Sequence, residues 1–444
     1  MSTLTSERAA PGGPRSSTPG LVDSVRARRA MVILVWAYSI ASPVVETVFS
    51  DRQHYVEGKT SAVALALTLD SLGAIVVPVV AVATTFFVGL FWRVTAPSLI
   101  LVIAPGLVLA ANELVHGRPP TLGLLVTAAV GALLVSVRVK TPDLALVGYL
   151  GAIVAAASIA AVYLAPSKVL IAGGTNSFDK SLTGAPLLAG IFTHSNTFGM
   201  FLSLALPFVF LARRWPVRLV LFAVVMWALI LSSSRTALVG VAVVLAVLLL
   251  ARVLPRSAFA PVAVGGFAVA VFAVFWLPFT ETDPEAYTYR GAIWIFDRQQ
   301  LGDHWFFGLG AHWFADNYAL LRSVLSSAAS HAHNLALTAL MQGGAVVLVA
   351  WGALLVIALF ATLRRPSARQ RGVGVAFVMA LLVMGATETP FGLVGWGPLS
   401  ASALIPLFVL AGQGWIEREE DEFTRALDAA SVPLTRAALR ARRR

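Results

Sequence analysis

The sequence contains a series of long apolar runs, and these constrain its fold more than any other feature. A helix that crosses about 30 Å of hydrocarbon needs about 20 apolar residues. Hydrophobic residues make up 58% of the 444 and charged residues 12%, more apolar sequence than a soluble core needs. The sequence predicts an all-α polytopic membrane protein of about 12 transmembrane helices, at 28–48, 70–92, 96–114, 119–137, 143–165, 196–213, 217–233, 235–253, 259–279, 335–362, 371–388 and 396–414. The apolar stretch 61–69 could add a partial or re-entrant element.

The short connectors after the even-numbered runs carry most of the cations and predict the orientation of the chain. Arg138 and Lys140 follow the fourth run, and Arg364, Arg365 and Arg371 follow the tenth. Because cytoplasmic loops are enriched in Lys and Arg, both termini are predicted to be cytoplasmic. The net charge of +11 therefore reflects topology and indicates no nucleic-acid partner. We expect a disordered tail at 1–27, a membrane domain at 28–414, and a basic tail at 415–444 that rests on anionic membrane lipids.

The histidines lie on the opposite, extracytoplasmic side in this topology. A long loop at about 280–334, between spans nine and ten, is rich in aromatic residues and is expected to fold into a partly helical cap. His304, His312 and His331 in this loop are expected to be structural or solvent-facing, whereas His333 stands just before a new span. The chain has no cysteine, no zinc-protease spacing and no P-loop, so neither a metal nor another cofactor is expected.

Three spans begin with polar residues at this outer face: His194-Ser195-Asn196, Ser234-Arg235-Thr236 and His333-Asn334. A helix N-terminus has unpaired N–H groups and a partial positive charge, so three that converge would form an anion pocket. With Arg235, Arg290 and Arg298, a phosphate or diphosphate is the expected ligand.

Each of these residues also has a structural interpretation. Ser195, Asn196, Ser234 and Thr236 could be ordinary helix caps. Arg235 could simply reach the headgroups. His333 could be a satisfied interfacial histidine, and Arg298 could pair with Asp297 or Asp303. Four acids near outer span ends could pair with the arginines or assist a base: Glu46, Asp70, Glu113 and Glu388.

Four motifs in order resemble the O-antigen ligase and polymerase superfamily. They span roughly residues 188–350 and read Gly190-Ile-Phe-Thr-His194-Ser-Asn196-Thr-Phe-Gly199, Ser232-Ser-Ser-Arg235-Thr-Ala, Arg290-Gly-Ala-Ile-Trp294 and His331-Ala-His333-Asn334. Gln342 departs from the family's frequent Glu, and Val347 from a common Gly.

The resemblance implies a glycosyltransferase of the bacterial cytoplasmic membrane. Such an enzyme moves a glycan from a polyprenyl-diphosphate donor to an acceptor hydroxyl, on a glycan or a lipid, at the outer face. By this resemblance Arg235 and Arg290 bind the diphosphate and His333 takes the proton. His194, Asn196, Asn334 and Arg298 are supporting residues.

Two alternatives stay open from the sequence. A transporter or flippase of the same lipid-linked glycan would place polar groups near the middle of the membrane, often in two similar halves. Here most charges lie at the rim, and the halves look unlike. A peptidoglycan polymerase of related helical fold would use the same donor type. Ligase and polymerase are not separated by these residues.

Overall fold

The structure is mostly helical. It is a computed structural model that describes residues 25–50, 63–91, 96–120, 122–171, 181–325 and 330–413. The long helices are α1 (Val25–Phe49), α3 (Ala64–Phe91), α4 (Ala96–Val115), α5 (Leu122–Ser136), α6 (Ala145–Leu164), α9 (Ser195–Val209), α10 (Trp215–Ser232), α11 (Arg235–Val253), α12 (Arg256–Thr280), α16 (Leu335–Leu363), α17 (Ala368–Gly385) and a last helix, Ser400–Gln413. The remaining elements are η2 (Thr141–Leu144), α7 (Pro166–Val169), α13 (Ala286–Leu301), α14 (Trp313–Asp316), α15 (Tyr318–Leu325) and an antiparallel pair of strands, β1 (Leu170–Ile171) and β2 (Leu187–Leu188).

Nine helices of the described chain are long and apolar enough to cross a membrane, as expected of a multi-pass membrane protein. Shorter apolar helices stand at the other three expected spans: α5, α9 and Ser400–Gln413. The total of twelve stays a prediction. The stretch 61–69 is no separate element over its described part, since α3 runs unbroken from Ala64 to Phe91. Most of the predicted N-terminal tail and all of the predicted C-terminal tail lie outside the described residues.

Small residues let the central helices α9, α11 and α17 approach closely. A Cβ atom at Gly199 of α9 would lie 2.6 Å from the Cβ of Ser234, just before α11. A Cβ at Gly240 of α11 would lie 2.9 Å from the sulfur of Met384 in α17. Close backbone approach at glycine is typical of helix packing in membranes. This packing brings the beginning of α9, the beginning of α11 and the end of α17 to one place.

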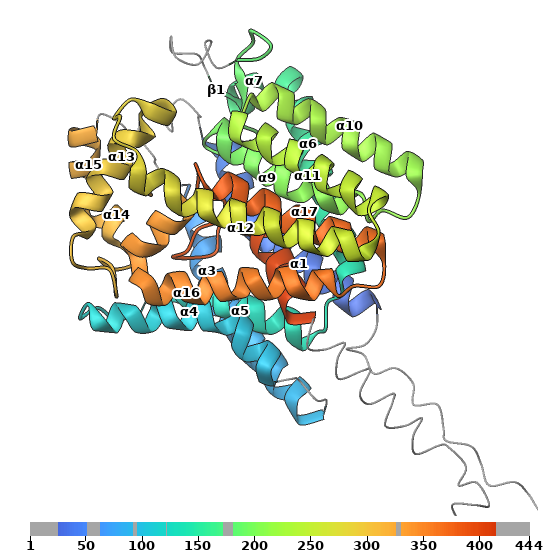
Figure 1. Ribbon diagram of the computed structural model, residues 1–444, viewed down its shortest axis with the longest axis horizontal. Coiled ribbons are helices and arrows are strands. Elements are labelled where there is room, and N and C mark those ends of the chain that lie inside the picture. Colours follow the sequence, from blue (N-terminus) through green and yellow to red (C-terminus); the bar gives the residue numbers. More distant parts are fainter. Residues whose placement is uncertain are drawn as a thin grey trace, which may run out of the picture.

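Helices α13, α14 and α15 form a cap at one end of the helix bundle, beside the ends of α12 and α16 (Figure 1). Trp294 is fully buried in the cap, and its indole N–H donates to the carbonyl of Ala332 at 2.9 Å. The cap thus fixes the segment that leads into α16. Its position outside the cytoplasm stays a prediction.

A break in α16 anchors the cap to the bundle. Gly344 has φ 65° and ψ −164°, which interrupts the helical hydrogen bonds. The cap backbone supplies the missing partners: Leu309 N donates to Met341 O at 2.7 Å, and Ala345 N donates to Trp305 O at 2.8 Å. Irregular backbone inside a spanning helix is tolerated where other protein groups satisfy it, so cap and bundle are joined through backbone hydrogen bonds.

Candidate functional site

A cavity of about 920 Å³, here called the site pocket, opens at the cap end of the bundle. The beginnings of α9, α11 and α16 all contribute to its lining, through Asn196, Arg235 and Thr338 among others. The predicted convergence of three helix N-termini is therefore present. The segment just after α17 and the first turn of α13 complete the walls.

Each of the three helix beginnings is capped by a side chain. His194 Nδ1 accepts from Asn196 N at 3.0 Å, and Ser234 Oγ accepts from Ala237 N at 3.4 Å. Asn334 is fully buried, and its Oδ1 accepts from Leu337 N at 2.9 Å. The capping interpretation is thus correct for Ser234, whereas the cap of α9 is His194 rather than Ser195 or Asn196, and Thr236 lies inside α11.

Asn334 also fixes the position of His333. Its Nδ2 donates to the carbonyl of Val274 and to that of Ala386, each at 2.9 Å. One amide therefore joins α16 to α12 and to the residue after α17. Since His333 precedes it directly, in a left-handed conformation with φ 49°, the ring is held by a rigid backbone. Non-glycine residues in this region are strained, and such strain gathers at functional sites.

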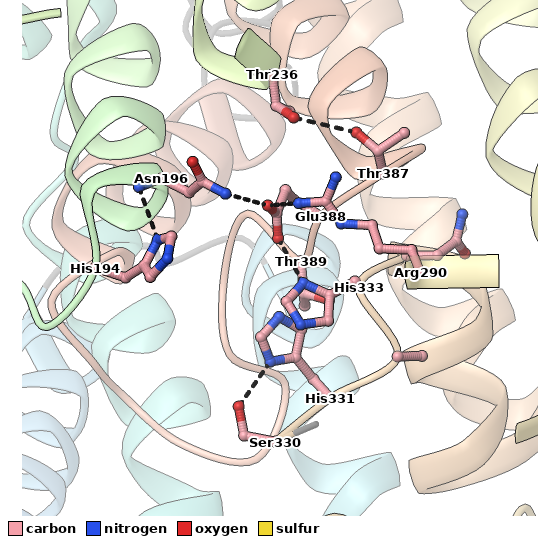
Figure 2. Close-up of polar contacts among 12 residues, drawn as sticks. His194, Asn196, Thr236, Arg290, Ser330, His331, His333, Thr387, Glu388 and Thr389 are labelled. Atoms are coloured by element: carbon pink, nitrogen blue, oxygen red, sulfur yellow. Dashed lines mark hydrogen bonds and ion pairs between the residues drawn. The ribbon is translucent and has the colours of Figure 1, made fainter. Parts of the chain in front are cut away.

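Glu388 is the centre of the polar cluster in the site pocket, as Figure 2 shows. Its Oε1 accepts from Arg290 and, at 3.1 Å, from Asn196 Nδ2. Its Oε2 lies 2.9 Å from His333 Nδ1. The Glu388 side chain is 3% exposed. Hydrogen bonds from three residues in separate parts of the chain therefore replace those that water would make.

Glu388 is ionised in this setting. Burial raises its pKa, but the hydrogen bond from His333, the charge of Arg290 and the charge of His333 when its ring is protonated outweigh burial and lower the pKa to about 2. An ionised carboxylate can only accept hydrogen bonds, so His333 Nδ1 must carry the hydrogen of their contact. The lone pair of the neutral ring is then on Nε2.

The two predicted diphosphate-binding arginines differ in their surroundings. Arg290 is bound to Glu388 and is 16% exposed. Arg235 is exposed, lines the site pocket, and makes no side-chain hydrogen bond or ion pair with any described residue. Its guanidinium is thus available to a ligand.

Arg290 owes its position to an unusual turn. The three residues before it, Tyr287 to Tyr289, all have left-handed conformations, with φ 52°, 62° and 65°. The regular part of α13 therefore begins only at Arg290, whose side chain projects toward Glu388 (Figure 2).

Arg298, predicted as a supporting residue, binds at the junction of α12 and α13 instead. It donates to the carbonyls of Pro278 and, at 2.8 Å, of Glu281, and so ties α13 to the end of α12. It does not line the site pocket. The alternative pairing with Asp297 or Asp303 is also wrong: among the described residues, the buried carboxylate of Asp297 has no hydrogen-bond partner, and Arg298 uses backbone carbonyls.

His331 lies in the site pocket, contrary to the expectation of a merely structural or solvent-facing residue. Its ring centre is 4.2 Å from that of His333, and its Nδ1 lies 3.0 Å from Ser330 Oγ. Burial, and after it the neighbouring charge of His333, lower its pKa to about 3. The ring is therefore neutral at ordinary pH. His304 and His312 do not line the pocket, and His54 lies outside the described residues.

The other three acids considered with Glu388 do not line the site pocket. Glu113 accepts from Ala311 N at 2.6 Å, and Asp70 accepts from Ser42 Oγ at 3.0 Å. The pocket also contains residues that motif reasoning did not assign, including Tyr289 and Thr389. Their hydroxyl groups and the aromatic ring suit a carbohydrate, but nothing in their local sequence distinguishes them.

Residues 219–352 match the family model described as O-antigen ligase. The matched region contains Arg235, Arg290 and His333, whereas Asn196 and Glu388 lie outside it. No curated protein matches the chain. The match confirms the resemblance that the motifs indicated: over residues 219–352, this multi-pass membrane protein is similar to the O-antigen ligases of the O-antigen ligase and polymerase superfamily.

Proposed function

We propose that the protein transfers a glycan from a polyprenyl-diphosphate donor to an acceptor hydroxyl at the outer face of the bacterial cytoplasmic membrane. The observation that carries this proposal is the joint placement, in one pocket, of a carboxylate-bound histidine and an arginine that has no hydrogen-bond or ion-pair partner among the described residues. His333 and Glu388 are 2.9 Å apart, and Arg235 lines the same cavity. Acid–base chemistry and anion binding can therefore occur side by side.

His333 is the general base in this reaction. Its Nε2 lone pair takes the proton of the acceptor hydroxyl as the oxygen attacks the anomeric carbon of the donor sugar. The bond between that carbon and the phosphate oxygen breaks, and the diphosphate leaves with the electron pair. Glu388 holds the productive tautomer and stabilises the imidazolium that forms, as the carboxylate of a catalytic triad does.

Arg235 and Arg290 bind the leaving diphosphate. Arg235 stands at the first position of α11, where the N–H groups and the helix dipole add to its charge. Arg290 uses part of its guanidinium on Glu388, but a guanidinium has five N–H donors, so others remain for phosphate oxygens. With charge stabilisation from arginines, the displacement proceeds without a metal in our proposal.

The donor's lipid tail occupies a second, apolar groove of about 490 Å³ between α12 and α16. Val274 and Phe275 of α12 and Trp351 and Gly352 of α16 contribute to it. Leu393 lines both this groove and the site pocket, so the two hollows share a wall. A donor with a charged head and a long hydrocarbon tail needs such a pair of adjoining sites.

Glycan transfer by the purified protein tests the proposal. We would incubate the protein in detergent with an extracted polyprenyl-diphosphate oligosaccharide, an acceptor and a chelator. We expect transfer by the wild type and a rate about 10²–10⁴-fold lower in His333→Ala. Equal transfer by the two proteins would overturn the role of His333. Flipping of the labelled lipid in vesicles that contain no acceptor, without transfer in any assay, would favour the flippase alternative instead.

A further inference from the structure

We propose that His331, His333 and Glu388 form a binding site for a divalent transition-metal ion, best matched by Zn²⁺, and that the bound ion inhibits the enzyme. The inhibitory half rests on the function proposed above, whereas the binding half does not. The cluster is the one group of three or more His, Asp or Glu residues with metal-ligand spacing among the described residues.

The three ligand atoms are close enough for one ion. Each residue offers an imidazole nitrogen or a carboxylate oxygen, and these atoms all lie within 4.8 Å of one another. Zinc binds such atoms at about 2.0–2.2 Å, which places tetrahedral ligands roughly 3.3 Å apart. His333 Nδ1 and Glu388 Oε2, at 2.9 Å, already meet this spacing. A small rotation of the His331 ring would bring its ligand nitrogen to the same spacing from the other two ligand atoms.

The donor set selects the metal. Two imidazoles and one carboxylate, with a fourth position left to water, are a combination that zinc sites use. Mg²⁺ and Ca²⁺ prefer an all-oxygen shell, so they should bind poorly here. Imidazole donors suit Zn²⁺, Cu²⁺ and Ni²⁺, of which Zn²⁺ accepts the tetrahedral arrangement most readily.

Neighbouring groups already orient two of the ligands. The hydrogen bond between His331 Nδ1 and Ser330 Oγ, 3.0 Å long, leaves Nε2 for the ion. Glu388 Oε1 is held by Arg290 and Asn196, so Oε2 is the oxygen that faces His333. Outer-shell hydrogen bonds of this kind orient metal ligands. The charge of Arg290 opposes a cation, and we therefore expect reversible binding.

A bound ion would stop the proposed reaction. The ion binds the Nδ1 lone pair of His333, and the hydrogen that Nδ1 shared with Glu388 moves to Nε2, so Nε2 no longer has a lone pair to accept a proton. His331 has no part in the proposed transfer, and this inference gives a reason for its place beside His333.

Isothermal titration calorimetry of the full-length protein with zinc chloride tests whether the three residues bind the ion. The protein is purified without a histidine tag, stripped with chelator and exchanged into chelator-free buffer. We expect one Zn²⁺ per chain, weakened about tenfold or more in His331→Gln, and unchanged affinity in the matched control His304→Gln, an exposed histidine of the cap. Magnesium chloride should give no binding. Unaltered zinc affinity in His331→Gln would overturn the site, provided that thermal unfolding without zinc shows the variant to be folded.

Transfer assays test the inhibitory half. Zinc should inhibit the wild type, chelator should restore its activity, and His331→Gln should need a higher zinc concentration for the same fractional loss. Zinc that binds without slowing transfer would overturn inhibition. A protein with no transferase activity at all would refute the proposed function, while the titration would still decide the metal site.

Discussion

Glu388 and His333 are joined by a 2.9 Å contact between Oε2 and Nδ1 across 55 residues of sequence, just after α17 and just before α16. Because the pKa of Glu388 is lowered to about 2, its carboxylate is charged wherever a neutral histidine can act as a base. The pair fixes which ring nitrogen carries the hydrogen. In the proposed reaction it makes Nε2 of His333 the proton acceptor.

Substitution of His333 by Ala removes the proposed base. General-base catalysis typically contributes about 10²–10⁴-fold in rate, so kcat should fall by that factor while donor binding persists. Initial rates of glycan transfer and binding of labelled donor check this. His304→Ala, at an exposed histidine of the cap, is the matched control and should transfer normally. Comparable rates in the two variants would contradict the assignment.

Substitution of Glu388 by Gln tests the positioning role. An amide can donate to Nδ1, which would favour the wrong tautomer of His333, and it no longer pairs as a charge with Arg290. We expect kcat to fall about 100-fold or more and the pH–rate profile to change. Glu388→Asp should recover part of the rate, since it keeps the charge. A variant with Gln that retains both the rate and the profile would show that Glu388 only holds the fold.

Substitution of Arg235 by Ala should chiefly weaken donor binding. The side chain makes no hydrogen bond or ion pair with described residues and is exposed, so its loss should leave the thermal stability nearly unchanged. A charge-assisted contact to phosphate is worth about 1.5–3 kcal/mol, and the KM for donor should rise about tenfold or more. Arg235→Lys should restore part of it. The control is Arg322→Ala, an exposed cap arginine outside the pocket. An equal KM in wild type and Arg235→Ala would exclude this role.

The sequence predicted the elements of the site better than their contacts. Helix beginnings can be found from polar residues that precede apolar runs, so the convergence near His194, Arg235 and His333 was foreseeable once the topology was set. Glu388 was one of four acids that could assist a base, but the sequence did not single it out as the partner of His333, because Glu388 reaches it only through the packing of α17 in the bundle. The position of Arg290 depends on the left-handed turn at 287–289, which no local residue preference indicates.

Substitution of Asp297 by Asn should stabilise the cap at neutral and alkaline pH. Burial raises the pKa of Asp297 well above its ordinary value of 3.8, so the folded protein keeps the proton that the unfolded chain loses. The contribution of Asp297 to the free energy of unfolding is complete at a pH below its ordinary pKa of 3.8 and declines as the pH rises above it. Asn has no proton to lose. The unfolding temperature in detergent should therefore exceed that of the wild type more at about pH 8 than at about pH 5.

Asp316→Asn is the control for this measurement, because Asp316 is exposed and pairs with the exposed Arg118. It should change the unfolding temperature little. Scans at one fixed rate are needed, since large membrane proteins often unfold irreversibly. If the difference in unfolding temperature between wild type and Asp297→Asn did not depend on pH, Asp297 would be ionised in the folded state.

Substitution of Gly352 by Phe should obstruct the groove proposed for the lipid tail. A Cβ at Gly352 has no heavy atom within 4 Å, so the ring can enter the groove without displacing backbone. Gly265 of α12 is equally open but does not line the groove, and Gly265→Phe is the matched control. The KM for a long-chain donor should rise in Gly352→Phe alone. A short prenyl diphosphate donor that does not reach Gly352 should be used equally well by all three proteins. If Gly352→Phe lost activity equally with short and long donors, the new phenyl ring would be disturbing His333 and not the binding of the tail. Such a disturbance could pass through Asn334, which follows His333 and joins α16 to α12.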